Sequence, residues 1–148
     1  MMTPSDEPLN LVLVEDDDAD AIAIKRGLSK AGVDGKIFRA HDGVEALDML
    51  HGGGERLPEK FIVLVDVNMP RMSGLEFLDE LRKDPVLRRA IVFVLSTSRD
   101  RRDIEAAYSF NVAGYFVKED IGRKYHKLVE TLDFFIKSGE LPPIPSAA

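Results

Sequence analysis

The chain contains no cysteine, and it has no long apolar segment. The lack of cysteine excludes disulfides and thiolate metal sites, and it fits a reducing compartment. The longest fully apolar run, residues 90–95, has six residues, far fewer than the roughly 20 that a membrane-spanning helix needs. The first residues, MMTPSDEP, lack the basic and apolar regions of a signal peptide. We therefore expect a cytoplasmic protein.

Positive charge is scarcer than negative charge. Lys and Arg number 20 and Asp and Glu number 26, so the formal net charge is −6. A general nucleic-acid-binding surface is not expected from this balance. The length of 148 residues, with 45% apolar and 31% charged residues, is typical of one globular domain.

The sequence does contain a regular alternation of two apolar patterns. Short apolar runs, typical of strands in a parallel sheet, occupy residues 9–14, 36–40, 61–65, 91–95 and 114–117. Each is followed by helical apolar spacing, in segments that begin near Ala19, Asp42, Ser73, Asp100 and Tyr125. Five strands that alternate with five helices predict right-handed βαβ units and a sheet covered on both faces.

Two segments fall outside this alternation. Residues 51–60 include three successive glycines and form a long loop, which is either a tolerated surface insertion or a partner-specific feature. Residues 139–148, GELPPIPSAA, cannot continue a helix and form either a loose end or an extended arm. We therefore divide the chain into a tail (1–8), one domain (9–138) and a C-terminal tail or arm (139–148).

Polar side chains stand where the predicted strands end. Glu15 and Asp16 follow the first strand, Asp66 the third, Ser96 the fourth and Lys118 the fifth. Open α/β sheets bind ligands at the carboxyl ends of their strands, so these side chains should share one rim. Two carboxylates about 5 Å apart repel by roughly 3 kcal/mol at an effective dielectric near 20, so a positive group belongs between them. An all-oxygen site suits Mg²⁺.

These residues are the parts that phosphoryl transfer needs. Asp66 can act as the nucleophile, Lys118 can neutralise phosphoryl oxygens, and Ser96 can hydrogen-bond the bound group. Each residue also has an ordinary structural explanation, because acids after strands commonly cap helices and a surface lysine is commonly solvated. Their joint placement at the strand ends favours the functional interpretation.

Four segments, LVLVEDDDAD, IVLVDVNMPRMSGLEFL, VFVLSTS and AGYFVK, resemble the response-regulator receiver family. The resemblance runs from about residue 9 to residue 137. Asp66 precedes Ser96 by 30 positions and Lys118 by 52, as in typical receivers. The strongest signal is DVNMP with the following Gly74. The resemblance implies a doubly wound (βα)5 fold of the α/β class, with the flavodoxin-like strand order 2-1-3-4-5.

The resemblance also implies a phosphoacceptor and a metal site. Asp66 would accept a phosphoryl group from the histidine of a sensor kinase. Mg²⁺ would be held by the carboxylates of Asp16 and Asp66, by the backbone carbonyl of Asn68 and, through a water molecule, by Glu15. Asp17, which is adjacent, is interpreted as a helix cap.

A switch is implied as well. Ser96 takes the place of the family's hydroxyl residue, Lys118 that of its lysine, and Tyr115 that of the aromatic that changes rotamer on activation. The alternative for Tyr115 is a half-buried strand aromatic. Many receivers have proline after the lysine, often after a cis peptide, whereas this chain has Glu119. A cis bond would cost about 3 kcal/mol here, so the conformation of this peptide is open.

Partners are suggested by the end of the chain. After Lys137 eleven residues remain, too few for an output domain, so we expect signalling by protein contact rather than stand-alone enzyme activity. The long loop, the Ser-Thr-Ser segment and the apolar last helix look like single-domain regulators paired with bacterial phytochrome kinases. The last helix has three successive apolar residues (Phe134, Phe135 and Ile136), and the tail adds Leu141 and Ile144. These residues either complete the core, with the tail on its own domain, or form a homodimer through the last helix and exchanged arms.

Three rival interpretations are weaker. An aspartyl-phosphate phosphohydrolase resembling the haloacid dehalogenases needs an acid two positions after the nucleophile, where this chain has Asn68. A flavodoxin-like nucleotide or flavin binder needs a phosphate-cradling loop after the first strand, whereas EDDDAD repels phosphate. A phosphorylation-independent receiver-like scaffold would not need the acidic residues together with Ser96 and Lys118.

Overall fold

The computed structural model describes residues 8–69, 71–121 and 125–145. In this part of the chain, five parallel strands form one sheet in the order β2-β1-β3-β4-β5. This confirms the predicted flavodoxin-like topology. The strands are β1 (Leu11–Val14), β2 (Ile37–Ala40), β3 (Ile62–Asp66), β4 (Ile91–Ser96) and β5 (Gly114–Val117).

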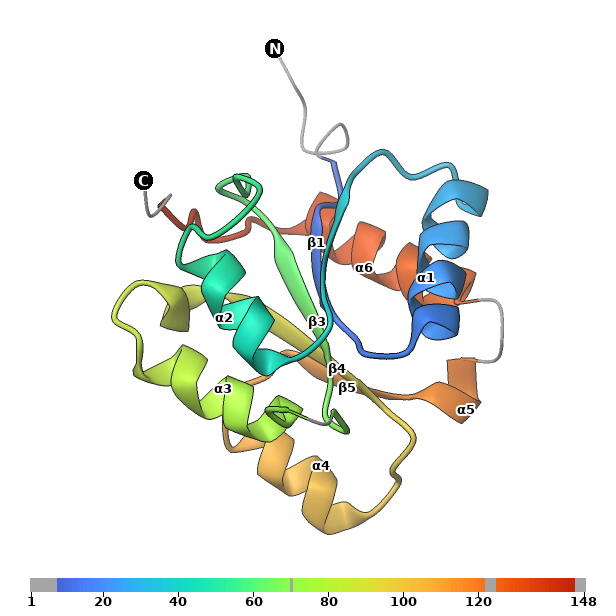
Figure 1. Cartoon of the computed structure of the whole chain (residues 1–148). Coiled ribbons are helices and arrows are strands. Elements are labelled where there is room, and N and C mark those ends of the chain that lie inside the picture. The colour runs from blue at the N-terminus through green and yellow to red at the C-terminus, as the bar shows by residue number, and fades with distance from the viewer. Residues whose placement is uncertain (1–7, 70, 122–124, 146–148) are drawn as a thin grey trace.

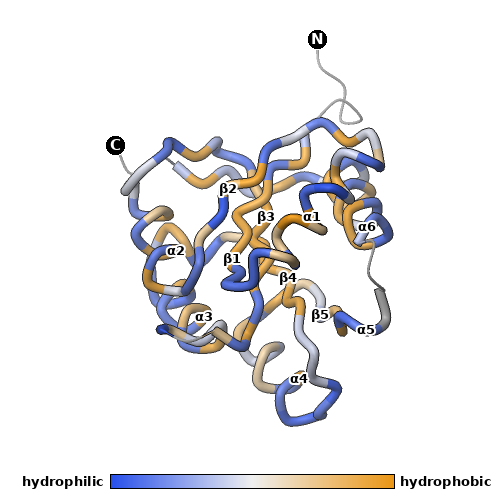
Figure 2. The backbone as a smooth tube through the Cα atoms, turned by 45° about the vertical axis from the view of Figure 1, so that its right-hand side comes forward, coloured by the Kyte–Doolittle hydropathy of each residue, from blue (hydrophilic) through white to orange (hydrophobic). Residues whose placement is uncertain are grey.

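Helices cover both faces of the sheet (Figure 1). One face is covered by α1 (Asp18–Lys30) and α6 (His126–Ser138), and the other by α2 (Gly43–Leu50), α3 (Gly74–Lys83) and α4 (Arg101–Tyr108). A one-turn helix, α5 (Lys118–Ile121), and a 3-10 turn (Leu87–Arg89) complete the regular elements. The central strands β1 and β3 are buried at every position because both of their faces are covered, and Figure 2 shows them as the apolar centre of the molecule.

The predicted helix starts carry the expected caps. Asp17 accepts a hydrogen bond from the backbone N–H of Asp20 at 2.9 Å, so its interpretation as a cap is confirmed. Asp42 caps α2 in the same way, and Ser73 forms a capping box with Glu76 at the start of α3. These capping hydrogen bonds explain why α1, α2 and α3 begin near the residues predicted from the sequence.

The described residues contain one short helix in addition to the five that were predicted. β5 ends at Val117, and Lys118 begins the additional helix α5. The last helix begins at His126 rather than at Tyr125, because Tyr125 has the left-handed backbone angle φ 48°. Its side chain continues the helical apolar spacing, so the pattern alone could not locate this boundary. Among the described residues no peptide bond is cis, and the Lys118–Glu119 peptide is therefore trans.

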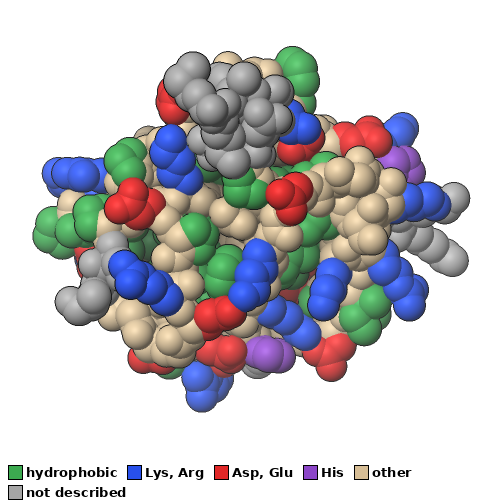
Figure 3. Space-filling model, turned by 90° about the horizontal axis from the view of Figure 1, so that it is seen from above, with side chains coloured by type: hydrophobic (Ala, Val, Ile, Leu, Met, Phe, Trp, Pro, Cys, Tyr) green, Lys and Arg blue, Asp and Glu red, His purple; other side chains and the backbone are tan. Residues whose placement is uncertain are grey.

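The described part of the C-terminal tail lies on its own domain. Leu141 and Ile144 are both buried, Leu141 on the α1 and α6 side of the sheet and Ile144 on the other side. The backbone N–H of Ile144 donates to the carbonyl of Glu59, in the long loop, at 2.8 Å. The tail thus crosses the end of the sheet at which the strands begin. Figure 3 views this end, where acidic and basic side chains are interspersed.

Within the described residues, no helix has the length and apolar character that crossing a bilayer would require.

Candidate acidic site at the carboxyl end of the sheet

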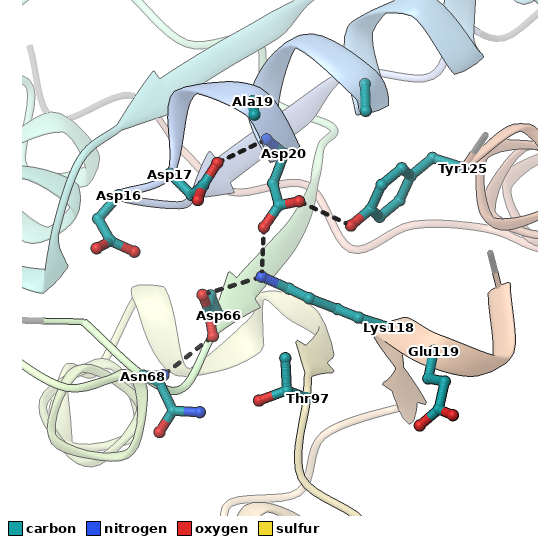
Figure 4. A pocket seen from close by; sticks show the side chains of 11 residues that line it. Asp16, Asp17, Ala19, Asp20, Asp66, Asn68, Thr97, Lys118, Glu119 and Tyr125 are labelled. Carbon is teal, nitrogen blue, oxygen red and sulfur yellow. Dashed lines mark hydrogen bonds and ion pairs between the residues drawn. The ribbon is translucent and has the colours of Figure 1, made fainter. Parts of the chain in front are cut away.

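An open pocket of about 830 Å³ lies at the carboxyl ends of the strands. Its lining includes Asp16, Asp20, Asp66, Asn68, Lys118 and Tyr125 (Figure 4). The sheet register explains why distant residues meet here. Val14 of β1 pairs with Val65 of β3, so the residues that follow them, Glu15 and Asp66, end neighbouring strands at the same level.

Three of the predicted acids form one cluster. Glu15, Asp16 and Asp66 each offer a carboxylate oxygen, and these oxygens lie within 4.8 Å of one another. Glu15 and Asp66 are buried, whereas Asp16 is exposed at the mouth of the pocket. Three carboxylate oxygens with no sulfur or imidazole ligand are a donor set that fits a hard divalent cation such as Mg²⁺. Such an ion would also offset the mutual repulsion of the acids.

The pKa of Glu15 shows that bringing these acids together is electrostatically unfavourable. Burial, followed by the hydrogen bond and the negative charge of Asp66, raises the pKa of Glu15 to about 8, although Lys118 acts in the opposite direction. The loop that carries Glu15 is held by Arg39 of β2. Its Nε and Nη2 donate to the Glu15 carbonyl at 3.1 and 3.0 Å. The role of Arg39 was not predicted, because only the sheet register places it beside this loop.

Lys118 reaches the cluster from the start of α5. Its Nζ lies 2.7 Å from Oδ2 of Asp20, 3.0 Å from Oε1 of Glu15 and 3.3 Å from Oδ2 of Asp66. Burial alone lowers the pKa of Lys118, but the hydrogen bonds to Asp20 and Glu15 and the charge of Asp66 outweigh it and raise the pKa above its ordinary value. The ammonium group is therefore a permanent cation shared by three acids.

Asp20 and Tyr125 are the pocket residues that the sequence did not reveal. Asp20 lies in the first turn of α1, where acids are common, so the sequence held no specific signal for its place in the pocket. Tyr125 donates its hydroxyl to Oδ1 of Asp20 at 3.0 Å. Burial and this hydrogen bond raise the pKa of Tyr125 to about 12, so its hydroxyl stays protonated.

Asn68 and Gly74 shape the segment that follows Asp66. The backbone N–H of Asn68 donates to Oδ1 of Asp66 at 3.0 Å, which orients the carboxylate. A Cβ atom at Gly74 would lie 2.5 Å from the carbonyl oxygen of Asp66 and 2.5 Å from Cα of Val67. The start of α3 can approach β3 this closely only with glycine, which is a physical reason for the glycine after DVNMP.

Ser96 and Tyr115 lie beside the pocket rather than among its lining residues. Ser96 is fully buried, and its Oγ accepts from the backbone N–H of Ser98 at 3.1 Å. Tyr115 donates its hydroxyl to the carbonyl of Ser98 at 2.9 Å. Thr97, rather than Ser96, lines the pocket. The loop after β4 therefore joins Ser96 to Tyr115 through Ser98.

The comparisons with known proteins agree with this geometry. The family described as "Response regulator receiver domain" matches residues 11–130. The probable methanogenesis regulatory protein FilR2 of Methanothrix harundinacea is 36% identical over 133 residues, which cover 85% of this chain and 84% of FilR2. Response regulator Rcp1 of Synechocystis is 31% identical over 145 residues, which cover 96% of this chain and 99% of Rcp1.

Two solved structures are similar over nearly their full length. The Mn²⁺-bound form of Rcp1 has a TM-score of 0.78 and 30% identity, and the match covers 91% of this chain and 99% of that one. The phosphorylated cyanobacterial phytochrome response regulator RcpA has a TM-score of 0.79 and 30% identity, with 92% and 99% covered.

Proposed function

This chain belongs to the response regulator receiver domain family, and from that premise we propose that it is a single-domain regulator phosphorylated on Asp66 by a sensor histidine kinase. Receiver domains act in two-component signalling rather than as classical enzymes, and they bind Mg²⁺ at an acidic pocket. The observation that carries the proposal is the approach of Lys118 to Asp66 and Glu15 in the pocket at the carboxyl end of the sheet.

Asp66 is the proposed acceptor. A carboxylate oxygen of Asp66 forms a bond to phosphorus while the phosphorus–nitrogen bond of the kinase phosphohistidine breaks, and that electron pair returns to the imidazole nitrogen. An aspartate reacts as its carboxylate, so no separate base is needed. The N–H of Asn68 keeps one oxygen of Asp66 occupied and thereby orients the other.

Charge neutralisation is assigned to Lys118 and to the metal site. The Nζ of Lys118 lies 3.3 Å from Asp66, so it can bind the oxygens of the phosphoryl group as that group approaches. Asp16, Asp66, the carbonyl of Asn68 and, through water, Glu15 would hold Mg²⁺. When bound, Mg²⁺ supplies further positive charge for the phosphoryl oxygens.

The output is proposed to be a conformational switch. A phosphoryl group on Asp66 adds negative charge and acceptor oxygens, which attract the hydroxyl of Ser96. The hydroxyl of Ser96 now accepts from Ser98, and the carbonyl of Ser98 accepts from Tyr115. Movement of Ser96 therefore disturbs the loop that holds Tyr115, and a rotamer change of Tyr115 alters the surface around β4, α4 and β5.

The proposed partner is a bacteriophytochrome-type histidine kinase in the cytoplasm. The support is the similarity to RcpA, which is described as a phytochrome response regulator, together with AtBRR, a bacteriophytochrome response regulator with 29% identity and a TM-score of 0.67. The test is phosphotransfer from a phytochrome kinase compared with an unrelated histidine kinase. Equal transfer rates from both would contradict this pairing.

Besides the kinase, we propose a second partner, another copy of this chain, bound through α6 as a homodimer. Phe134 is 72% exposed on α6, beside Phe135, whose ring packs edge-on against Phe93 at 5.4 Å. Removing the tail would uncover the core beneath Leu141 and Ile144, so Phe134→Lys is the cleaner variant for sedimentation. A wild-type dimer that becomes monomeric in this variant supports the contact, and a wild-type monomer contradicts it.

The decisive experiment is intact mass after incubation with acetyl phosphate and Mg²⁺. We expect one added phosphoryl group in the wild type, none without Mg²⁺, and none in Asp66→Asn. Asp79→Asn, a half-buried acid on α3 outside the pocket, is the matched control and should be phosphorylated normally. A protein that gains no phosphoryl group and does not bind beryllofluoride would instead be a scaffold, and turnover of a generic phosphatase substrate would favour a phosphohydrolase.

A further inference from the structure

The closest carboxylate to the Lys118 ammonium belongs to Asp20 rather than to the proposed phosphoacceptor. The Nζ of Lys118 is 2.7 Å from Asp20 and 3.3 Å from Asp66. The other oxygen of Asp20 accepts from the hydroxyl of Tyr125. A continuous series of contacts, Asp66–Lys118–Asp20–Tyr125, therefore crosses the pocket from β3 to the start of α6 (Figure 4).

Tyr125 stands where α1 and α6 meet. It is 5% exposed, precedes the first residue of α6 and has a left-handed backbone, although it is not glycine. A Cβ atom at Gly27 of α1 would lie 3.1 Å from the carbonyl carbon of Tyr125 and 3.2 Å from the backbone nitrogen of His126. The backbone of Tyr125 is thus held close against α1, so a change at its hydroxyl acts on a tightly packed junction.

We propose that Asp20 is a positioning residue that restrains Lys118, and that Asp20 and Tyr125 transmit the state of Asp66 to the junction between α1 and α6. The inference rests on the proposed function, because it assigns a consequence to a charge added at Asp66. It adds a second route beside the one through Ser96 and Tyr115, which leads to the opposite face of the sheet.

The physical argument is competition for one ammonium group. Lys118 is the cation shared by Glu15, Asp20 and Asp66. A phosphoryl group on Asp66 adds charge and acceptor oxygens beside Nζ, so Lys118 shifts toward it. Asp20 then loses its nearest positive partner, and the hydroxyl of Tyr125 becomes its remaining donor. The Tyr125–Asp20 hydrogen bond therefore strengthens when Asp66 is modified.

Tyrosine NMR tests the route directly, because the chain contains only three tyrosines. Protein with tyrosine labelled at Cζ is titrated with beryllofluoride and Mg²⁺. We expect the signals of Tyr115 and Tyr125 to shift. In Asp20→Asn, the shift of Tyr125 should disappear while that of Tyr115 remains. A wild-type Tyr125 signal that does not respond, or one that still responds in Asp20→Asn, overturns the proposal.

A kinetic measurement tests the restraint on Lys118. At saturating Mg²⁺, Asp20→Asn should be phosphorylated by acetyl phosphate about 5-fold faster than wild type, because the competing carboxylate is gone. Tyr125→Phe keeps that carboxylate but frees it for Lys118, so its rate should fall. Asp79→Asn and Tyr108→Phe are the matched controls and should keep the wild-type rate. Unchanged rates in both pocket variants contradict the restraint.

The two proposals fail in different ways. If the wild type takes up neither a phosphoryl group nor beryllofluoride, the proposed function is wrong. If the adduct forms and Tyr115 responds while Tyr125 does not, the proposed function stands and the route through Asp20 is wrong. Thermal unfolding of each variant shows that it is folded, and both pocket substitutions are close to isosteric.

Discussion

At the carboxyl end of the sheet three carboxylates share one ammonium group, whereas at the amino end two apolar side chains of the tail close the sheet. An acid at each end illustrates the difference. Burial and the neighbouring Asp66 raise the pKa of Glu15 to about 8. Asp84, after α3, has a lowered pKa because it accepts from the backbone N–H of Leu87, from His51 and from the N–H of Val86.

The comparison shows that one fold places acids in opposite energetic situations. The charge of Asp84 is stabilised by donors from its own loop, so the acid favours the folded state. The charge of Glu15 is opposed by burial and by Asp66, so its ionisation does not favour the folded state. We therefore expect substitutions at the carboxyl end of the sheet to change function, whereas those at the amino end should change stability alone.

Replacement of Lys118 by Met should have the largest effect. It removes the cation of the pocket and should slow phosphorylation by acetyl phosphate about 100-fold. It should also lower the free energy of unfolding by about 3 kcal/mol, because three acids lose their partner. Phosphorylation rates and denaturant unfolding measure the two effects, and Lys83→Met, an exposed lysine on α3, is the control. A rate close to that of the control would contradict the assignment of Lys118.

Leu141→Ala tests the end of the sheet at which the strands begin. Loss of a buried leucine should lower the free energy of unfolding by about 2 kcal/mol, measured by urea unfolding. Phosphorylation of Asp66 should stay within about twofold of wild type, since the tail lies at the other end of the sheet. Val86→Ala, which is 40% exposed, is the control for a change of surface side chain. A large loss of phosphorylation in folded Leu141→Ala would show that the two ends are coupled.

Glu15→Gln should stabilise the protein when Mg²⁺ is absent. Replacing a buried carboxyl whose ionisation is opposed by its surroundings should raise the free energy of unfolding by about 1 kcal/mol. Added Mg²⁺ should stabilise the wild type by binding the folded state, and it should stabilise this variant less. Thermal unfolding with and without Mg²⁺ measures both effects, with Glu80→Gln as an exposed control. If Glu15→Gln destabilises the protein without metal, Lys118 already compensates the negative charge of the acids, which would contradict this prediction.

Asp84→Asn should give the smallest effect, and one that depends on pH. The folded-state pKa of Asp84 is depressed, so its contribution is present above the unfolded pKa of about 3.9 and is lost as pH falls through the folded value. We expect the variant to be about 1 kcal/mol less stable than wild type at pH 7, and the difference to shrink as the pH falls below about 3.9. Unfolding curves across this range measure the difference. A constant difference at all pH values would contradict the ionic explanation.

Much of the site was predictable because its residues end strands. Glu15, Asp16, Asp66 and Lys118 follow apolar runs, and the rule for open α/β sheets places such positions on one rim. The structure brings all four together.

The residues that were missed belong to contacts between distant segments. Asp20 meets Lys118 across 98 positions, and Tyr125 meets Asp20 across 105. No local pattern reports such a contact. Asp20 also fits the first turn of a helix, where acids are common, so its ordinary explanation concealed its position in the pocket.

The sequence by itself determined the strands, the helix caps and the strand-end residues of the pocket, because apolar spacing and capping depend on neighbours a few positions apart. Only the tertiary structure decided which acid lies nearest to Lys118, where the last helix begins, and which part of the core the tail covers. These outcomes depend on how packed layers bring far-separated side chains into contact, and packing responds to the whole set of neighbours at once.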